Sequence, residues 1–302
     1  MDRFRLRIPA TAANLGPGFD GLALALQLHN TIDVERRPSG LAFDITGQGA
    51  SQLLRDESNL MIRAAWHTLE ALGTARPGLR LAAHHQIPLG SGLGSSAAAV
   101  VAGVLLAEAL AGARLELTDK LALAAELEGH ADNAAAALLG GLVVSRYQHG
   151  LVTAVRIEPA AQTVLVVVPA VDRPTAHMRQ VLPDQVPLAA AANNAASLAL
   201  LIEALRRGDH ALIAQAARDE LHEPYRLPLI PGAEAARQAG LRAGASAVVL
   251  AGAGPGLLAL AADGLTAIGA AMQAAFQQAA VACQVYHLSI DFTGATLVPP
   301  SA

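Results

Sequence analysis

The stretch PLGSGLGSSAAAV, residues 88–100, combines residue types that bind anions. From Gly90 to Ser96 it holds three glycines and three serines, and an alanine-rich apolar run follows. A strand predicted before it and a helix predicted after it would aim free backbone N–H groups and the positive end of the helix dipole at one spot. A plain strand-to-helix turn, with Ser95 or Ser96 capping the helix, needs fewer glycines. The pattern therefore favours a phosphate-binding loop over the plain turn.

Three common phosphate motifs do not fit this loop. A Walker loop needs a lysine, and the only lysine of the chain is the distant Lys120. The protein-kinase set needs a strand lysine and an H-R-D loop, and the sequence has neither. In the dinucleotide fingerprint a third glycine belongs where Ser95 stands, and no acidic residue follows at the expected distance.

Two further stretches match one family of small-molecule kinases. They are PATAANLGPGFDGLALAL, residues 9–26, and LAGAGPGLLAL, residues 250–260. Together with PLGSGLGSSAA they resemble the three motifs of the GHMP kinases, which use ATP and Mg²⁺. Within that family, PATAANLGPGFD, EGHADN followed by LLGG, and HEPYR are similar to the homoserine kinase branch. The departures, at Ala251, at Gly256 and in NAAAALLGG, are mild and concern the fit of the backbone.

The resemblance implies an α+β fold with two domains and an active site between them. Residues 1–160 would form the N-terminal ATP-binding domain with a left-handed β-α-β unit, and residues 161–302 a C-terminal ferredoxin-like domain. The second half, read independently, gives the order strand, helices, strand, strand, helix, strand, which agrees with this expectation.

The resemblance places ATP and its metal on the second and third motifs. The expected ATP-binding residues of the second motif are Pro88, Leu89, Gly90, Ser91, Gly92, Leu93, Gly94, Ser95, Ser96, Ala97 and Ala98. The third motif contributes Gly252, Gly254 and Gly256. Ser96 and Glu128 match the metal-ligating pair, although a serine there could simply cap a helix and Glu128 could be an exposed helix-end residue. A carboxylate at a helix C-terminus opposes the dipole, so a nearby cation is expected.

The resemblance also assigns six residues to the substrate, L-homoserine. They are Asn14, Asp20, His130, Thr175, Arg179 and Arg226. The Asp20 carboxylate would lie near the ammonium group, and the two arginines would bind the carboxylate, for which the guanidinium fork is suited. The alternatives are turn formation for the first two residues, an ordinary buried histidine, and solvated arginines.

The position of a catalytic base depends on one residue of register. Relatives such as mevalonate kinase carry an aspartate after a similar H-G stretch, and here either Asp132 or Asn133 takes that place. The homoserine kinase resemblance favours Asn133, whose amide cannot accept a proton as a carboxylate does. The hydroxyl proton would then pass to a phosphate oxygen, and Asp132 would serve structure by capping the following helix.

The implied reaction is transfer of the γ-phosphoryl group of ATP to the hydroxyl of L-homoserine, in the route to threonine. One alternative is a GHMP kinase for mevalonate or a sugar alcohol. Another is a non-catalytic nucleotide-binding relative, which should have lost metal or phosphate residues, whereas Glu128, Ser95 and Ser96 are retained. A homodimer is compatible with the resemblance.

Hydrophobic patterning predicts the elements that position these residues. Strands are expected at 3–9, 22–28, 31–37, 41–46, 79–87, 163–169, 246–251, 257–262 and 282–290, and a hairpin at 141–157. Helices are expected at 58–72, from a cap at Ser95 or Ser96 to 112, at 119–129, at 188–207 and at 210–221. Two more are expected, one ending at Gly244 and one beginning at about Leu265. The stretch PYRLPLIPG is expected to be a loop.

Composition excludes several other functional classes. The chain of 302 residues is 53% hydrophobic, but its longest apolar run, 97–113, is mostly alanine and contains Glu108, so no membrane span is expected. A net charge of −4 and 3% aromatic residues argue against nucleic-acid binding. The N-terminus reads as a strand rather than a signal peptide, and the single Cys283 fits a reducing cytoplasm.

Overall fold

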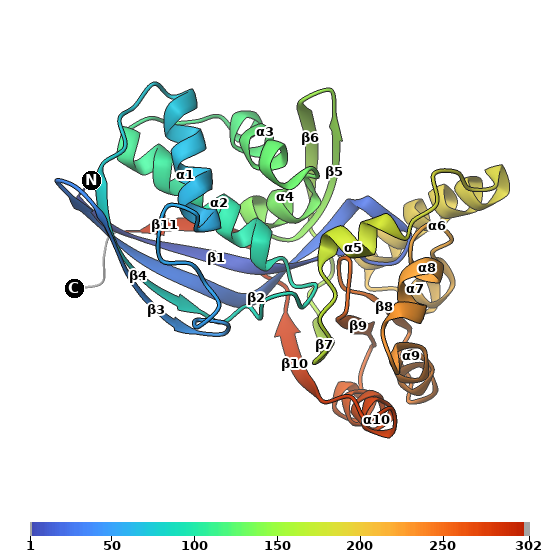
Figure 1. The fold of residues 1–302 in the computed structure, drawn as a ribbon. Coiled ribbons are helices and arrows are strands. Elements are labelled where there is room, and N and C mark those ends of the chain that lie inside the picture. Colours follow the sequence, from blue (N-terminus) through green and yellow to red (C-terminus); the bar gives the residue numbers. More distant parts are fainter. Residues whose placement is uncertain (1, 299–302) are drawn as a thin grey trace.

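Two sheets form the two lobes of the molecule, of which the computed structural model describes residues 2–298 (Figure 1). The first sheet has seven strands: β1 (Arg3–Asn14), β2 (Gly18–Arg37), β3 (Leu41–Gly47), β4 (Gly78–His85), β5 (Leu142–Gln148), β6 (Leu151–Ile157) and β11 (Thr296–Val298). The strands run in the order β11-β1-β2-β4-β3, and the β5–β6 hairpin pairs with β2. β3 and β4 are parallel and are joined through α1 (Leu60–Ala71), which makes the expected β-α-β unit.

The two predicted strands at 22–28 and 31–37 are one continuous strand, β2. A bulge explains the difference, because the register against β1 shifts from Pro9 opposite His29 to Ala10 opposite Leu26. Gln27 and Leu28 are the extra residues that this bulge absorbs, so the break in alternation does not end the strand.

Helices α1 to α4 cover one face of the first sheet (Figure 1). After α1 they are α2 (Ser95–Ala111), α3 (Leu117–Glu128) and α4 (Asp132–Leu139). α2 is buried along most of its length, and at Gly103 it approaches α1 so closely that a Cβ would lie 2.4 Å from the carbonyl oxygen of Met61. The predicted serine cap of α2 is wrong: the N-cap is Gly94, in the left-handed conformation, with no side-chain cap bond. Ser95 and Ser96 are instead the first two helical residues.

The second sheet has the strand order of a ferredoxin-like domain. Its strands are β7 (Thr163–Pro169), β8 (Ala247–Leu250), β9 (Leu257–Leu260) and β10 (Cys283–Ser289), antiparallel in the order β10-β7-β9-β8. Its helices are α5 (Thr175–Gln180), α6 (Leu188–Arg207), α7 (His210–Ala216), α8 (Glu223–Arg226), the 3₁₀ turn Leu227–Leu229, α9 (Ala233–Arg242) and α10 (Leu265–Gln278).

Two helices of this domain, α7 and α8, differ from the sequence-based expectation. α7 ends at Ala216, five residues before the predicted end, and α8 forms largely within the segment predicted as a loop.

Of the described helices, α6 alone is long and apolar enough to cross a membrane on length and composition, and 28% of its apolar window is buried. A single helix of this kind among residues 2–298 is weak evidence of a membrane span.

Candidate active site

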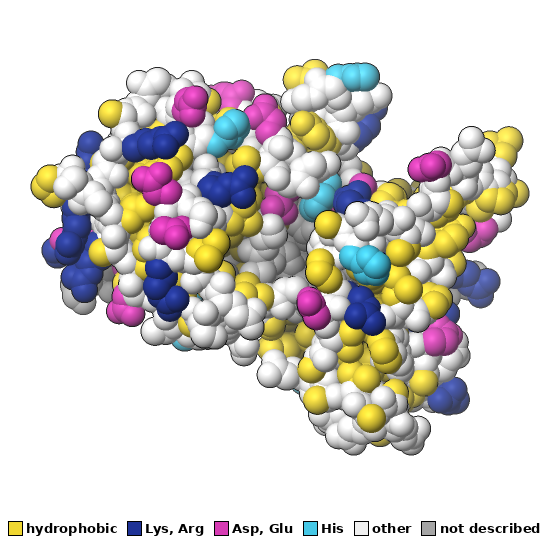
Figure 2. All heavy atoms as spheres, in the orientation of Figure 1, with side chains coloured by type: hydrophobic (Ala, Val, Ile, Leu, Met, Phe, Trp, Pro, Cys, Tyr) yellow, Lys and Arg dark blue, Asp and Glu magenta, His cyan; other side chains and the backbone are white. Residues whose placement is uncertain are grey.

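The three sequence motifs meet in one cleft between the two lobes, where the surface is hollowed (Figure 2). The cavity has a volume of about 430 Å³. Of the predicted site residues, it is lined by Asn14, Asp20, Gly90, Ser91, Gly92, Gly94, Ser95, Ser96, Ala97, Glu128, His130, Asn133, Thr175, Arg179, Arg226, Gly252 and Gly254. A larger cavity of about 630 Å³ beside the start of α10 holds none of them.

Five predicted residues do not line this cleft. Leu93 and Ala98 are buried in the core, and Gly256 packs its backbone against the glycine loop, where a Cβ would lie 2.4 Å from the carbonyl oxygen of Ser91. Leu89 faces a separate hollow beside β7 and β10, and Pro88 lies behind the loop, where its carbonyl accepts a bond from Ser91 Oγ. These residues shape the loop and do not reach the cavity.

The three glycines of the loop have positive φ angles, of +61° at Gly90, +81° at Gly92 and +67° at Gly94. The expected reason for glycine was close approach of a phosphate, and for two of the three positions the structure gives another reason. A Cβ at Gly92 would lie 2.1 Å from the carbonyl oxygen of Ala251, and one at Gly94 would lie 2.0 Å from Thr11 Oγ1. Only at Gly90 would a Cβ meet open space. The loop is therefore packed against the third motif as well as open to the cleft.

Ser96 and Glu128 come together from the start of α2 and the end of α3. Ser96 Oγ donates a hydrogen bond of 2.5 Å to Glu128 Oε1. Burial raises the pKa of Glu128, against the effects of the Ser96 hydrogen bond and of the charge of His130. A hydroxyl and one carboxylate beside a phosphate loop are the oxygen donors with which Mg²⁺ completes its coordination on a nucleotide.

His130, Asp132 and Asn133 form a connected group at the start of α4. Asp132 is 2% exposed, and its Oδ1 accepts bonds from His130 Nδ1 (2.8 Å) and from the backbone N–H of Asn133 (2.7 Å). Burial lowers the pKa of His130, but the hydrogen bond and charge of Asp132 outweigh it, so this pKa is raised overall. Thr11 Oγ1 donates to Asn133 Oδ1 at 2.8 Å, which leaves the amide NH₂ without a partner among the described residues. Asn133 thus offers the cleft a donor.

The first motif turns sharply at the edge of the cleft, with positive φ at Asn14 and Asp20. Both ends of the Asn14 amide are engaged: Oδ1 accepts from the Asp20 N–H at 3.0 Å, and Nδ2 donates to the Gly252 carbonyl at 2.8 Å. Asn14 therefore shapes the turn and ties it to the third motif. Arg179 donates two bonds to the Asp20 carboxylate, at 2.7 and 2.9 Å. Thr175 lies exposed at the start of α5.

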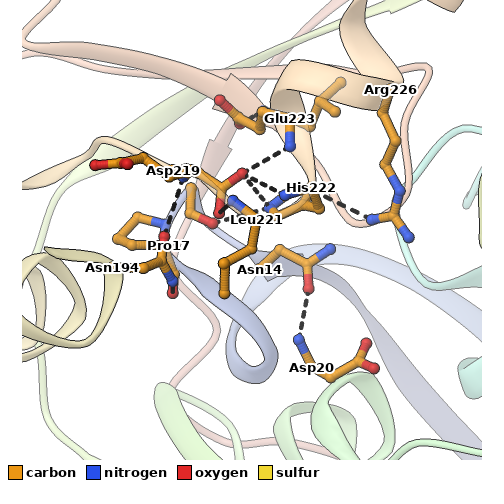
Figure 3. A network of polar contacts seen from close by, with 12 residues as sticks. Asn14, Pro17, Asp20, Asn194, Asp219, Leu221, His222, Glu223 and Arg226 are labelled. Carbon is orange, nitrogen blue, oxygen red and sulfur yellow. Dashed lines mark hydrogen bonds and ion pairs between the residues drawn. The ribbon is translucent and has the colours of Figure 1, made fainter. Parts of the chain in front are cut away.

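Arg226 is 1% exposed, yet no carboxylate pairs with it among the described residues. Its Nε donates to the Met178 carbonyl at 2.9 Å, and Nη1 contacts His222 Nδ1 at 3.3 Å (Figure 3). Nη2 has no partner in residues 2–298. Burial, with the charge of Arg179 adding to it, lowers the pKa of Arg226 to about 10. A buried guanidinium in this state is set up to receive an anion.

Sequence reasoning missed three residues that support this site: Thr11, Phe19 and His222. All three lie inside the quoted motifs PATAANLGPGFD and HEPYR. The motif match could have drawn attention to them, but their contacts are long-range, such as that from Thr11 to Asn133, and no local pattern predicts such contacts.

The motifs, the ferredoxin-like order and the cleft agree with comparisons to known proteins. The family models for the N-terminal and C-terminal domains of GHMP kinases match residues 59–141 and 201–278. A homoserine kinase of Moorella thermoacetica is 40% identical over 294 residues, which cover 97% of this chain and 99% of the relative. The chain belongs to the GHMP kinases. The predicted family is thereby confirmed.

Further relatives extend the match to solved structures. A homoserine kinase of Streptomyces coelicolor is 46% identical over 231 residues, which are 75% of this chain and 74% of that protein. The crystal structure of a homoserine kinase from Cytophaga hutchinsonii superposes with a TM-score of 0.86 at 31% identity, covering 99% of this chain and 98% of the other. A mevalonate kinase of L. major shares the fold with a TM-score of 0.69 at 20% identity, covering 97% and 96% of the two chains.

Proposed function

We propose that this chain is a homoserine kinase, which transfers the γ-phosphoryl group of ATP to the side-chain hydroxyl of L-homoserine in threonine biosynthesis. The observation that carries the proposal is the buried, unpaired Arg226 in the cleft of the glycine loop. Asp20 places a carboxylate in the same cleft. One cationic and one anionic site together suit an amino-acid zwitterion. Mevalonate has no ammonium group for Asp20, and a neutral sugar alcohol has neither charge.

The Asp20–Arg179 pair gives homoserine a way to bind without leaving a charge unpaired. The substrate ammonium takes the place of the guanidinium on Asp20, and the substrate carboxylate takes the place of Asp20 on Arg179. Arg226 then completes the carboxylate site with its free N–H groups, since guanidinium forks bind carboxylates bidentately. The Thr175 hydroxyl lines the same part of the cleft. Each charged group then faces a group of opposite charge, with the two arginines sharing the one substrate carboxylate.

On the other side of the cleft, the glycine loop and the start of α2 bind the phosphates of ATP through backbone N–H groups. The oxygens of Ser96 and Glu128 would hold Mg²⁺, which neutralises phosphate charge as the phosphoryl group moves. Asn133 cannot act as a carboxylate base, so the hydroxyl proton passes to a phosphate oxygen. Asn133 and His130 orient the hydroxyl from their place between the two halves of the cleft.

The test is ADP release by the purified protein with ATP and Mg²⁺ across a panel of alcohols. Homoserine is compared with 3-aminopropan-1-ol, which lacks its carboxylate, and with 4-hydroxybutyrate, which lacks its ammonium group. We expect homoserine to accelerate ADP release and each analogue to lose at least about tenfold in kcat/KM, because each leaves one charged group of the site without its substrate partner. Mevalonate and a sugar alcohol serve as further acceptors. No acceleration by homoserine, or a preference for a neutral alcohol, overturns the proposal.

A further inference from the structure

The guanidinium of Arg226 is held from three sides. Its Nε donates to the Met178 carbonyl at 2.9 Å, and its Nη1 points to His222 Nδ1 at 3.3 Å. The third contact is the ring of Phe19, whose centroid lies 5.3 Å from the guanidinium carbon. Because the side chain is buried, these contacts decide where its free N–H groups point.

His222 is itself fixed in place. Its ring is fully buried and stacks on Phe19, with centroids 5.3 Å apart and planes at 25°. Nε2 lies 2.9 Å from the Gly16 carbonyl, which can only accept, so Nε2 carries the hydrogen. Nδ1 is then the acceptor for Arg226. Burial lowers the pKa of His222, which keeps the ring in this neutral form.

Asp219 holds the backbone of His222 in turn. Its Oδ2 accepts bonds of 2.7 Å from the N–H groups of His222 and Glu223, and it lies 3.7 Å from His222 Nε2 (Figure 3). The imidazole therefore bridges the first motif at Gly16, in the N-terminal half, and Arg226 on α8, in the C-terminal half.

From this geometry we infer that His222 is a positioning residue: its Nδ1 lone pair sets the Arg226 guanidinium in the orientation that receives the substrate carboxylate. The inference rests on the proposed function, since it takes Arg226 as the carboxylate-binding group. Within the described part of the chain, the polar and ring contacts of the His222 side chain are to Gly16, Phe19, Asp219 and Arg226, none of them in the glycine loop, so we expect its effect to be confined to the amino-acid substrate.

Two substitutions separate the two bonds of the imidazole. In His222→Asn the amide oxygen can take the place of Nδ1 and accept from Arg226, but the bond to Gly16 is lost. In His222→Gln the amide NH₂ can reach the Gly16 carbonyl, but no acceptor remains for Arg226. We expect His222→Gln to raise the homoserine KM about tenfold or more and His222→Asn about threefold or less, with the ATP KM changed less than about twofold in both.

A double-mutant cycle with Arg226→Met tests whether the effect passes through Arg226. In that background His222→Gln should cause no further loss of kcat/KM for homoserine. Equal KM effects of the two His222 variants, or a full further loss in the Arg226→Met background, overturns the inference.

Phe19→Leu covers the case in which His222→Gln does not fold, because Phe19 is only partly buried. Loss of its ring should raise the homoserine KM about three- to tenfold and leave the ATP KM unchanged. An unchanged homoserine KM overturns the inference. If the wild-type protein phosphorylates no carboxylate-bearing alcohol, the proposed function is overturned as well. If the wild-type protein is active on homoserine and the variants keep its homoserine KM, this inference alone is overturned.

Discussion

At the scale of single residues, the site is defined by which polar atoms are already engaged. The family resemblance placed Asn14 and Arg226 together as substrate ligands, but the Asn14 amide is bonded at both ends and the Arg226 guanidinium is not. The same distinction applies to Asp132 and Asn133. Asp132 lines the cleft, and its Oδ1 accepts two hydrogen bonds, from the His130 ring and from the Asn133 N–H. These bonds let Asp132 orient His130. The predicted helix cap at Asp132 is wrong, because the N-cap of α4 is Ala131, without a side-chain cap bond, and Asp132 is the first helical residue.

Substitution of Asp132 tests this assignment. Asp132→Asn keeps an oxygen in the Oδ1 position for both donors, so kcat should remain within about tenfold of wild type. Loss of a general base would lower kcat by at least about a hundredfold. Asp132→Ala removes that oxygen and should be clearly worse than Asp132→Asn in both activity and stability. Steady-state kinetics of the two folded variants decide the matter. A folded Asp132→Asn enzyme slowed about a thousandfold at unchanged KM would identify Asp132 as the base.

At the scale of elements, local patterns predicted most strands and helices, and long-range contacts set the rest. α6 begins at Leu188 and ends at Arg207, as predicted. It ends there because Gly208 takes the left-handed conformation that terminates a helix. The predicted helix 210–221 instead ends at Ala216, and the Asp219 carboxylate accepts N–H groups at the start of α8. β11, which no pattern indicated, exists through its pairing with β1. The reason for Gly92 could not be predicted either, since the carbonyl that excludes a side chain there is in the third motif.

The glycine loop offers a matched pair of substitutions, Gly90→Ala and Gly92→Ala. Both positions have positive φ, so both variants carry the same backbone cost of about 1–2 kcal/mol. Only at Gly92 does the new Cβ meet the Ala251 carbonyl, which should cost on the order of 1–3 kcal/mol more. Gly90→Ala should keep most of its stability but bind ATP about tenfold more weakly, because Gly90 lines the cleft and belongs to the loop that we expect to bind the phosphates. Urea denaturation and ATP titration measure both effects, and equal stability of the two variants would contradict the contact between the motifs.

At the scale of the whole molecule, the two lobes are tied by main-chain contacts around the cleft. Asn14 forms a bridge with Ala251, and Leu26 forms one with Ile290. The chain then returns to the first sheet, where Asp291 pairs with His29 at 2.7 Å in a buried contact. Beside the first bridge, Glu223 Oε1 accepts a bond of 2.6 Å from the N–H of Leu250, which fastens α8 to β8. The cleft therefore depends on a buried carboxylate that is not part of the site.

The charge of Glu223 should make the stability of the protein depend on pH. Burial raises its pKa from 4.5 to about 7, so between these values the folded state holds a proton that the unfolded state has lost. Stability from this group is therefore full below about pH 4.5 and falls as pH rises through about 7, by about 3 kcal/mol in all. Glu223→Gln keeps the acceptor for Leu250 and removes the charge. Relative to wild type, this variant should gain stability progressively from pH 5 to pH 8, reaching on the order of 1–3 kcal/mol.

Urea denaturation at intervals across that range measures the difference, with Glu70→Gln as the control. Glu70 lies exposed on α1, beside Arg76 and away from Glu223, so its substitution should leave the slope of stability against pH between 5 and 8 almost unchanged. If Glu223→Gln follows the wild-type slope, the carboxylate is already ionised in the folded protein at low pH. If it is instead less stable than wild type at pH 8, the 3.8 Å contact with Arg237 stabilises the charge enough to outweigh its burial.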